Sequence, residues 1–201
     1  DGSVDYIELK GDVVFDDVDF GYNPDKIVLH NVDLYATPGQ KIAFVGSTGA
    51  GKTTMVDLIL GVLKPQAGKI TVDGMDIKES YRGWHDKIGY IPQTIYMLDD
   101  TIRNNIAFGK VKSIDDAEIW AALKQAQLDE FVKSLDEGLD TMIGEAGVRL
   151  SGGQRQRVWI AMALCQGTKT LFLDEPTTYL DIRYQIEILQ LVKKLNQEFG
   201  I

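Results

Sequence analysis

Residues 46–53 carry the sequence GSTGAGKT, which fits the pattern of glycine, any four residues, glycine, lysine and then serine or threonine. A short apolar run, IAFV at 42–45, precedes this stretch, and apolar residues at helical spacing follow it: Met55, Leu58, Ile59 and Val62. We therefore expect a buried parallel strand at 42–45, a glycine-rich loop and a helix over 52–63. The N–H groups of such a loop and of the helix N-terminus can surround phosphate oxygens.

Two side chains of this loop have their own predicted roles. Lys52 would reach the β- and γ-phosphates of a nucleotide, and Thr53 would ligate magnesium. The alternative is a glycine-rich turn with an exposed lysine. The strand and the helix on either side favour the phosphate loop, because that is the context in which the pattern binds phosphate.

A second predicted strand, Thr170 to Leu173, ends in two adjacent carboxylates within the sequence LFLDE. At the carboxyl end of a core strand, Asp174 can hold magnesium through water, and Glu175 can activate an attacking water. Alone, an apolar run that ends in Asp-Glu is commonplace. Together with the phosphate loop it predicts a hydrolytic nucleotide site.

The sequence LSGGQ at 150–154 opens a predicted helix over 153–166. Two glycines after a serine offer unobstructed N–H groups, a hydroxyl and a positive helix end to an anion. The alternative is that Ser151 serves only as a helix cap. A helical insert separates this stretch from the phosphate loop, so we expect that the two cannot grip one phosphate within a single chain.

The N-terminal part of the chain has the alternation of half-buried antiparallel strands. VVFDDVDF at 13–20 alternates with one slip at Asp16 and Asp17, which predicts a bulge. Residues 28–35 alternate strictly, which places one set on a single face: Val28, His30, Val32 and Leu34. In ITVDGMDI at 70–77, Asp73-Gly74 predicts a hairpin turn.

The remaining elements are one buried strand and several helices. Ile88 to Ile91 has the composition of a strand, and the period is helical over 101–135, with Ser113 and Asp116 as a capping box. The last predicted helix covers 182–199. Its expected buried stripe consists of Ile182, Ile186, Leu189 and Val192.

Composition excludes several classes of protein. The 201 residues are 44% apolar and 25% charged, as in a globular domain with a real core, and no apolar run reaches the roughly 18 residues of a spanning helix. The opening DGSVDYIELKGD does not have the pattern of a signal peptide. The net charge of −9 opposes non-specific binding to nucleic acid or anionic lipid. The single cysteine, Cys165, lies in an apolar stretch and is expected to be buried.

The phosphate loop, LSGGQ, LFLDE and the order of elements resemble the nucleotide-binding domain of ATP-binding cassette (ABC) transporters over essentially the whole chain. The resemblance implies an α/β fold of the P-loop NTPase class, with a RecA-like core, an N-terminal antiparallel β-subdomain and an inserted α-helical subdomain. It implies one domain in three parts: 1–92 with the β-subdomain and the first part of the core, 93–157 with the helical subdomain, and 158–201 with the rest of the core.

The resemblance also implies site residues. Tyr22 matches the aromatic residue that stacks on adenine, and Gln93 in GYIPQ matches the glutamine that touches magnesium and signals to the membrane domain. Asp181 in TTYLD matches the aspartate of a loop that crosses a dimer, and Glu145 matches a loop that faces the membrane domain. Without the family, these would be a packed surface tyrosine, a loop amide and two solvated charges. His30 and His85 match no catalytic position and are expected to be structural.

The complete predicted site has three groups of residues. The catalytic group is Glu175, Gln93 and Lys52, and the magnesium group is Thr53, Gln93 and Asp174. The residues expected to contact ATP are Tyr22, Gly46, Ser47, Thr48, Gly49, Ala50, Gly51, Lys52, Thr53, Thr54, Ser151, Gly152, Gly153, Gln154 and Asp181.

The chain departs from the family pattern in two respects. Up to about residue 157 it resembles the exporter branch, whereas from Val158 it resembles the importers of iron siderophores and vitamins. The mixture suggests a recombined or designed chain, against natural divergence as the alternative. The chain stops at Gly200-Ile201, where the family continues into a strand with a switch histidine, so we expect weakened turnover.

On the family's terms, the chain is expected to bind and hydrolyse ATP as the motor domain of a transporter. Two copies would pack head to tail, with each ATP between the phosphate loop of one and the LSGGQ of the other. The expected partners are a second copy and a transmembrane domain, at the cytoplasmic face of a membrane. One alternative is an ATP-binding, dimerising module with little turnover. Another is a cassette ATPase that acts on DNA or ribosomes, which the acidic charge opposes.

Overall fold

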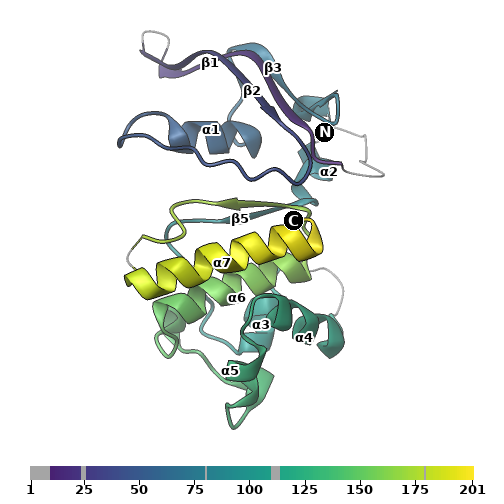
Figure 1. The fold of residues 1–201 in the computed structure, drawn as a ribbon, viewed down its shortest axis with the longest axis vertical. Coiled ribbons are helices and arrows are strands. Elements are labelled where there is room, and N and C mark those ends of the chain that lie inside the picture. Colours follow the sequence, from purple (N-terminus) through teal and green to yellow (C-terminus); the bar gives the residue numbers. More distant parts are fainter. Residues whose placement is uncertain (1–9, 24–25, 80, 110–113, 179) are drawn as a thin grey trace. The chain divides into compact units, whose positions relative to one another are not determined.

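The structure is a computed structural model that describes residues 10–23, 26–79, 81–109, 114–178 and 180–201. The chain divides into two compact units, residues 1–87 and 88–201. Figure 1 shows the strands of the first unit and most of the helices of the second. Ser113 and Tyr179, which belong to the predicted capping box and to the TTYLD stretch, lie outside the described residues.

The first unit contains the predicted antiparallel sheet. Its strands are β1 (Val13–Asn23), β2 (Lys26–Ala36), β3 (Ala67–Val72) and β4 (Met75–Asp76), in the order β2-β1-β3-β4. The predicted bulge in β1 is confirmed, because the register with β2 shifts between Phe15 and Val18 and Asp17 has φ 53°. The predicted hairpin is also confirmed: Asp73 and Gly74 connect β3 to β4 with φ 50° and 81°, the left-handed values of a two-residue turn.

The prediction for the faces of β2 was partly wrong. Leu29 is buried and His30 is exposed, although strict alternation placed His30 on the same face as Val32 and Leu34, which are half-buried. Asn31, with φ 45°, interrupts the alternation, and the pairing of β2 with β1 passes from Val32–Val18 to Leu29–Phe20. Because β2 has one residue more than β1 between these pairs, the side chains before Asn31 change face.

The helix after the glycine-rich loop is shorter than predicted. α1 (Lys52–Ile59) buries Met55 and Leu58, and then ends at Leu60 and Gly61, which has φ 72°. Val62 lies beyond the helix and is 68% exposed. After η1 (Ile77–Glu79), α2 (Tyr81–His85) supports this end of α1, because the indole of Trp84 donates a hydrogen bond to the Ile59 carbonyl at 2.7 Å.

The predicted buried strand at 42–45 is not formed. These residues have no strand geometry, and Val45 is 92% exposed. A strand buried on both faces depends on hydrogen-bonded neighbours at its edges and on helices over its faces. No described strand pairs with 42–45, so its apolar composition by itself does not hold it in a sheet.

The second unit contains the other two predicted core strands. β5 (Ile88–Ile91) and β6 (Thr170–Leu173) pair in parallel, with Ile91 opposite Leu173. Between them the chain forms a run of helices: α3 (Ile102–Ile106), α4 (Asp116–Gln125), α5 (Asp129–Lys133), η2 (Gly138–Asp140), η3 (Glu145–Gly147) and α6 (Gly152–Cys165). The predicted helical stretch and the predicted helix before β6 are therefore confirmed.

The predicted capping box of α4 was wrong. The N-cap is Asp115, whose carboxylate accepts a hydrogen bond from the Ala117 N–H at 3.4 Å. Asp116 is the first residue of the helix and cannot occupy the third position that a capping box requires. An aspartate immediately before the helix is as effective a cap as a serine, so the pattern was consistent with either start.

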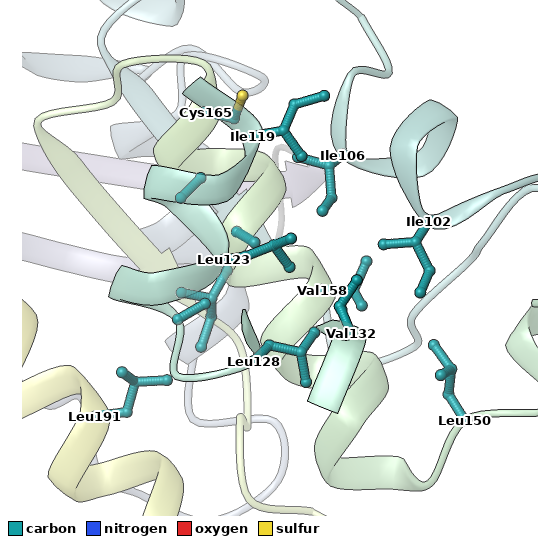
Figure 2. Packing of buried hydrophobic residues seen from close by; sticks show 14 of the residues in the cluster. Ile102, Ile106, Ile119, Leu123, Leu128, Val132, Leu150, Val158, Cys165 and Leu191 are labelled. Atoms are coloured by element: carbon teal, nitrogen blue, oxygen red, sulfur yellow. The ribbon is translucent and has the colours of Figure 1, made fainter. Parts of the chain in front are cut away.

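The last helix, α7 (Ile182–Phe199), packs through a different stripe from the predicted one. Its buried residues are Ile188, Leu191 and Leu195, whereas Ile182, Ile186 and Leu189 are 72%, 50% and 57% exposed. Apolar residues lie on two faces of this helix, and its hydrophobic periodicity does not identify which of the two faces packs against other elements. The buried face of α7 belongs to a hydrophobic cluster of the second unit. Figure 2 shows Leu191 with other side chains of this cluster, among them Leu123, Leu128 and Val158.

The same cluster confirms that Cys165 is buried, as predicted from its apolar surroundings. Among the described residues, no helix is both long enough and apolar enough to cross a membrane.

Candidate nucleotide-binding site

Glycines set the shape of the loop at 46–53. Gly49 and Gly51 have φ 84° and 89°, left-handed values that cost glycine little and other residues more. A Cβ on Gly51 would lie 2.9 Å from Leu29 Cδ2, so the start of α1 also packs closely against β2. The Ala50 N–H donates to the Ser47 carbonyl at 3.1 Å and closes the turn between them. The glycine pattern therefore has a steric reason at two of its positions.

The Lys52 ammonium folds back over this loop. Its Nζ donates to the carbonyls of Gly46 and Ser47, at 2.8 and 3.0 Å. No side chain caps the N-terminus of α1, whose N-cap position is Gly51. Uncapped N–H groups at a helix N-terminus and an adjacent ammonium are the donors that bind a phosphate anion. Thr53, the predicted magnesium ligand, is exposed at this end of the helix.

Tyr22 lies beside the same helix. Its hydroxyl is 3.0 Å from the Thr54 hydroxyl, and its ring is 5.2 Å from the Phe20 ring in an edge-to-face contact. The side chain is nevertheless 59% exposed. One hydrogen bond and one ring contact therefore fix an exposed aromatic side chain next to the helix that follows the phosphate loop. Thr54 itself is buried, and its hydroxyl is a partner of Tyr22.

In the second unit, the carboxyl ends of β5 and β6 bring three predicted residues close together. Asp174 follows β6, and its N–H donates to the Ile91 carbonyl at 2.9 Å. The Gln93 side chain, two residues after β5, donates from Nε2 to Glu175 Oε2 at 2.8 Å. Parallel strands end at the same edge of a sheet, which is why residues 82 positions apart meet there.

Two residues at this edge were not predicted from the sequence. The Tyr90 hydroxyl donates to Asp174 Oδ2 at 3.3 Å, and the Thr178 hydroxyl donates to Glu175 Oε2 at 2.9 Å. A polar ring within the apolar strand GYI and the turn sequence EPTT were the available signals. Neither signal says which atom such a side chain contacts, so only the structure identifies these partners.

Ser151 begins α6 as a full capping box. Its hydroxyl accepts from the Gln154 N–H at 3.2 Å, and its own N–H donates to the Gln154 side chain at 2.8 Å. In this structure Ser151 therefore serves as a helix cap, which was the alternative interpretation of its role. The cap leaves the hydroxyl proton available, because the hydroxyl acts as the acceptor in it. Cβ atoms on Gly152 and Gly153 would each lie 3.0 Å from a side-chain atom, of Leu180 and Tyr184 respectively.

The remaining predicted residues have simple surroundings. Asp181 is exposed at the N-cap position of α7, and its side chain makes no capping hydrogen bond. Glu145 is exposed at the start of η3. His85 Nε2 lies 2.5 Å from the Leu60 carbonyl at the end of α1, which supports the structural role expected for it.

The magnesium ligands predicted from the sequence are chemically suitable. Thr53, Gln93 and Asp174 offer hydroxyl, amide and carboxylate oxygens, the hard ligands that Mg²⁺ prefers. Among the described residues, no group of three or more His, Cys, Asp or Glu side chains could hold a metal. Magnesium in nucleotide sites is usually held by one or two carboxylates together with phosphates and waters, so the chemistry of each of these residues, taken singly, fits the ion.

A family model described as ABC transporter matches residues 29–178, which include the phosphate loop, LSGGQ and LFLDE. The chain belongs to the ABC transporter family. The resemblance inferred from the sequence motifs is thereby confirmed. The predicted fold class, an α/β P-loop NTPase with an antiparallel N-terminal subdomain and a helical subdomain, is confirmed as well.

Relatives of this ABC domain are ATP-binding proteins of the exporter type. It is 40% identical over 199 residues, 97% of the chain, to an uncharacterized ABC transporter ATP-binding protein of Bacillus subtilis, and covers 34% of that protein. It is 42% identical over 189 residues, 94% of the chain, to an ATP-dependent lipid A-core flippase of Saccharophagus degradans, and covers 32% of that protein. The chain thus spans about a third of the curated relatives that it matches.

A solved structure agrees with these relatives. A bacterial Atm1-family ABC exporter with ATP bound superposes with a TM-score of 0.82 at 35% identity, over 98% of this chain and 35% of that one. These matches run across both the exporter-like and the importer-like parts of the sequence. The interpretation of the chain as recombined or designed stays a prediction.

Proposed function

We propose that this ABC domain binds ATP with magnesium and hydrolyses it to drive a transporter. The observation that carries the proposal is the Lys52 ammonium, held over a glycine loop that leads into an uncapped helix. ABC ATP-binding domains are generally ATPases, and the solved relative described above has ATP bound. The functions of the relatives, such as flipping lipid A, are properties of those proteins.

Some of the proposed site residues bind ATP and magnesium, and another takes part in the hydrolysis itself. The loop N–H groups and Lys52 hold the phosphates, Tyr22 stacks on the base, and Asp174, Gln93 and Thr53 hold magnesium. Magnesium, when bound, neutralises charge that develops on the phosphate oxygens. Glu175 takes a proton from the attacking water. The Gln93–Glu175 hydrogen bond of 2.8 Å supports this division, because it joins the predicted metal-side amide to the predicted base.

The domain would act as a head-to-tail dimer. In this arrangement Ser151, Gly152, Gly153 and Gln154 of one copy complete the phosphate shell of the other, and Asp181 lies in the loop that crosses the dimer. The N-terminus of α6 supports this role, since two glycines follow its cap and present N–H groups without side chains. The partners would be a second copy and a transmembrane domain at the cytoplasmic face of a membrane, which Gln93 and Glu145 would face.

The test is ATP binding by calorimetry in Lys52→Ala, with Lys64→Ala as the control, because Lys64 is an exposed lysine of the first unit that lies outside the loop. We expect Lys52→Ala to weaken ATP binding at least tenfold, since a charge-assisted bond to phosphate is lost, and Lys64→Ala to change it less than twofold. Equal affinity in both variants and the wild type would contradict the phosphate-loop assignment.

ATP turnover with magnesium separates the two functional alternatives. Turnover that disappears in Glu175→Gln supports the motor, whereas tight binding without turnover supports an ATP-dimerised module. The expectation that the 201 residues by themselves turn over slowly stays a prediction, and the same assay tests it.

A further inference from the structure

The loop after β6 makes a tight turn whose geometry follows from its sequence, EPTT at 175–178. Pro176 occupies the second position of the turn, where its fixed φ is favourable, and the Thr178 N–H closes the turn on the Glu175 carbonyl at 3.0 Å. Glu175 has φ 45°, a left-handed value that is uncommon for a residue with a side chain. The turn brings the Thr178 side chain back beside the Glu175 carboxylate.

Two donors meet on one oxygen of that carboxylate. The Thr178 hydroxyl donates to Glu175 Oε2 at 2.9 Å, and Gln93 Nε2 donates to the same atom at 2.8 Å. Among the described residues, no hydrogen bond reaches Glu175 Oε1. Gln93 comes from the loop after β5 and Thr178 from the loop after β6, so the carboxylate is held from two separate segments.

We infer that Thr178 is a positioning residue for ATP hydrolysis: with Gln93 it occupies Oε2 of Glu175 and leaves Oε1 as the atom that accepts the proton of the attacking water. The inference rests on the proposed ATPase function. As the water oxygen bonds to the γ-phosphorus, the bond from that phosphorus to the bridging oxygen breaks and its electron pair leaves with ADP. The proton of the water moves to Oε1, and Thr178 keeps its own proton throughout.

A hydroxyl at 178 is not required for the turn itself. The backbone hydrogen bond and Pro176 hold the turn, and valine, which has nearly the shape of threonine, can replace Thr178 without removing either. The neighbouring Thr177 provides a matched control, because it is in the same turn but its hydroxyl makes no hydrogen bond to Glu175.

The kinetic experiment compares Thr178→Val, Thr178→Ser and Thr177→Val in steady-state ATP turnover. For Thr178→Val we expect kcat to fall about tenfold, with KM for ATP within twofold, because the variant loses orientation of the base and no phosphate contact. Thr178→Ser restores the hydroxyl and should recover kcat to within about threefold, and Thr177→Val should match the wild type. Wild-type kcat in Thr178→Val, or no recovery in Thr178→Ser, overturns the inference. The inference is also overturned if Thr178→Val loses ATP affinity and melting temperature together with kcat.

A second measurement does not depend on turnover. In the NMR spectrum of the nucleotide-free chain, the side-chain amide signals of Gln93 should shift in Thr178→Val, because the two residues share Glu175 Oε2, and should not shift in Thr177→Val. If the wild type binds ATP but does not hydrolyse it, the proposed function fails, and these signals still decide whether the carboxylate is shared. Unchanged Gln93 signals in Thr178→Val overturn the positioning role.

Discussion

For Tyr22, the sequence predicts a role and the structure adds the position of the side chain. The sequence resemblance predicts an aromatic residue for the adenine, and the structure fixes an exposed ring beside α1 through the Thr54 hydroxyl. We expect Tyr22→Ala to weaken ATP binding by about 1–3 kcal/mol, on the scale of base–aromatic stacking, and Tyr22→Phe to keep most of the affinity. Calorimetry measures both. Tyr35→Ala is the control, as Tyr35 is a similarly exposed tyrosine of the same sheet, and an equal loss in that variant would contradict stacking by Tyr22.

At the scale of elements, Arg103 connects three helices of the second unit. It lies on α3 and forms ion pairs with Asp116 of α4 and with Asp140 of η2, the latter at 2.8 Å. The hydrogen bond from Arg103 lowers the pKa of the Asp140 carboxyl below its usual value. The folded state therefore binds the Asp140 proton less readily than the unfolded chain. The resulting stabilisation is present above about pH 4 and is lost as the pH falls through the lowered pKa.

The Asp140→Asn variant tests this linkage. We expect it to unfold more easily than the wild type at pH 7 and the difference to be smaller at pH 3, because the wild-type carboxyl gains its proton as the pH falls toward the lowered pKa. Urea unfolding at both pH values gives the comparison. Asp136→Asn is the control, because Asp136 is an exposed aspartate of the same region. A deficit in Asp140→Asn that is the same at both pH values would show that the ion pair is not its cause.

At the scale of the whole molecule, the proposed dimer makes ATP the link between two chains. The Glu175→Gln variant removes the charge of the base and should favour the ATP-bound dimer. Hydrolysis no longer separates the two chains, and a carboxylate near the γ-phosphate is removed. Ser151→Arg, which places a long side chain at the cap of α6, should prevent it, whereas Ser134→Arg on the exposed end of α5 should not. Sedimentation with ATP and magnesium measures each case. A monomeric Glu175→Gln at saturating ATP would refute the arrangement.

The local motifs of this protein are determined by its sequence. The glycine pattern of the phosphate loop, the Asp73-Gly74 hairpin and the bulge near Asp17 were all predictable, because backbone conformation depends on neighbours along the chain. Lys52, Asp174 and Ser151 were identified as candidates for the same reason: each lies within a short motif. Their roles in ATP binding stay predictions until the variants are measured.

Tertiary packing decided the features that depend on residues far apart in the chain. The buried face of α7 is Ile188, Leu191 and Leu195 because a cluster on the other helices meets it, although an exposed stripe has the same period. Residues 42–45 have the composition of a core strand and form none, since a strand also needs partners. The contact of Gln93 with the Glu175 oxygen that Thr178 also reaches exists only because two parallel strands end side by side. A sequence determines which groups are present, but only folding determines the distances between them.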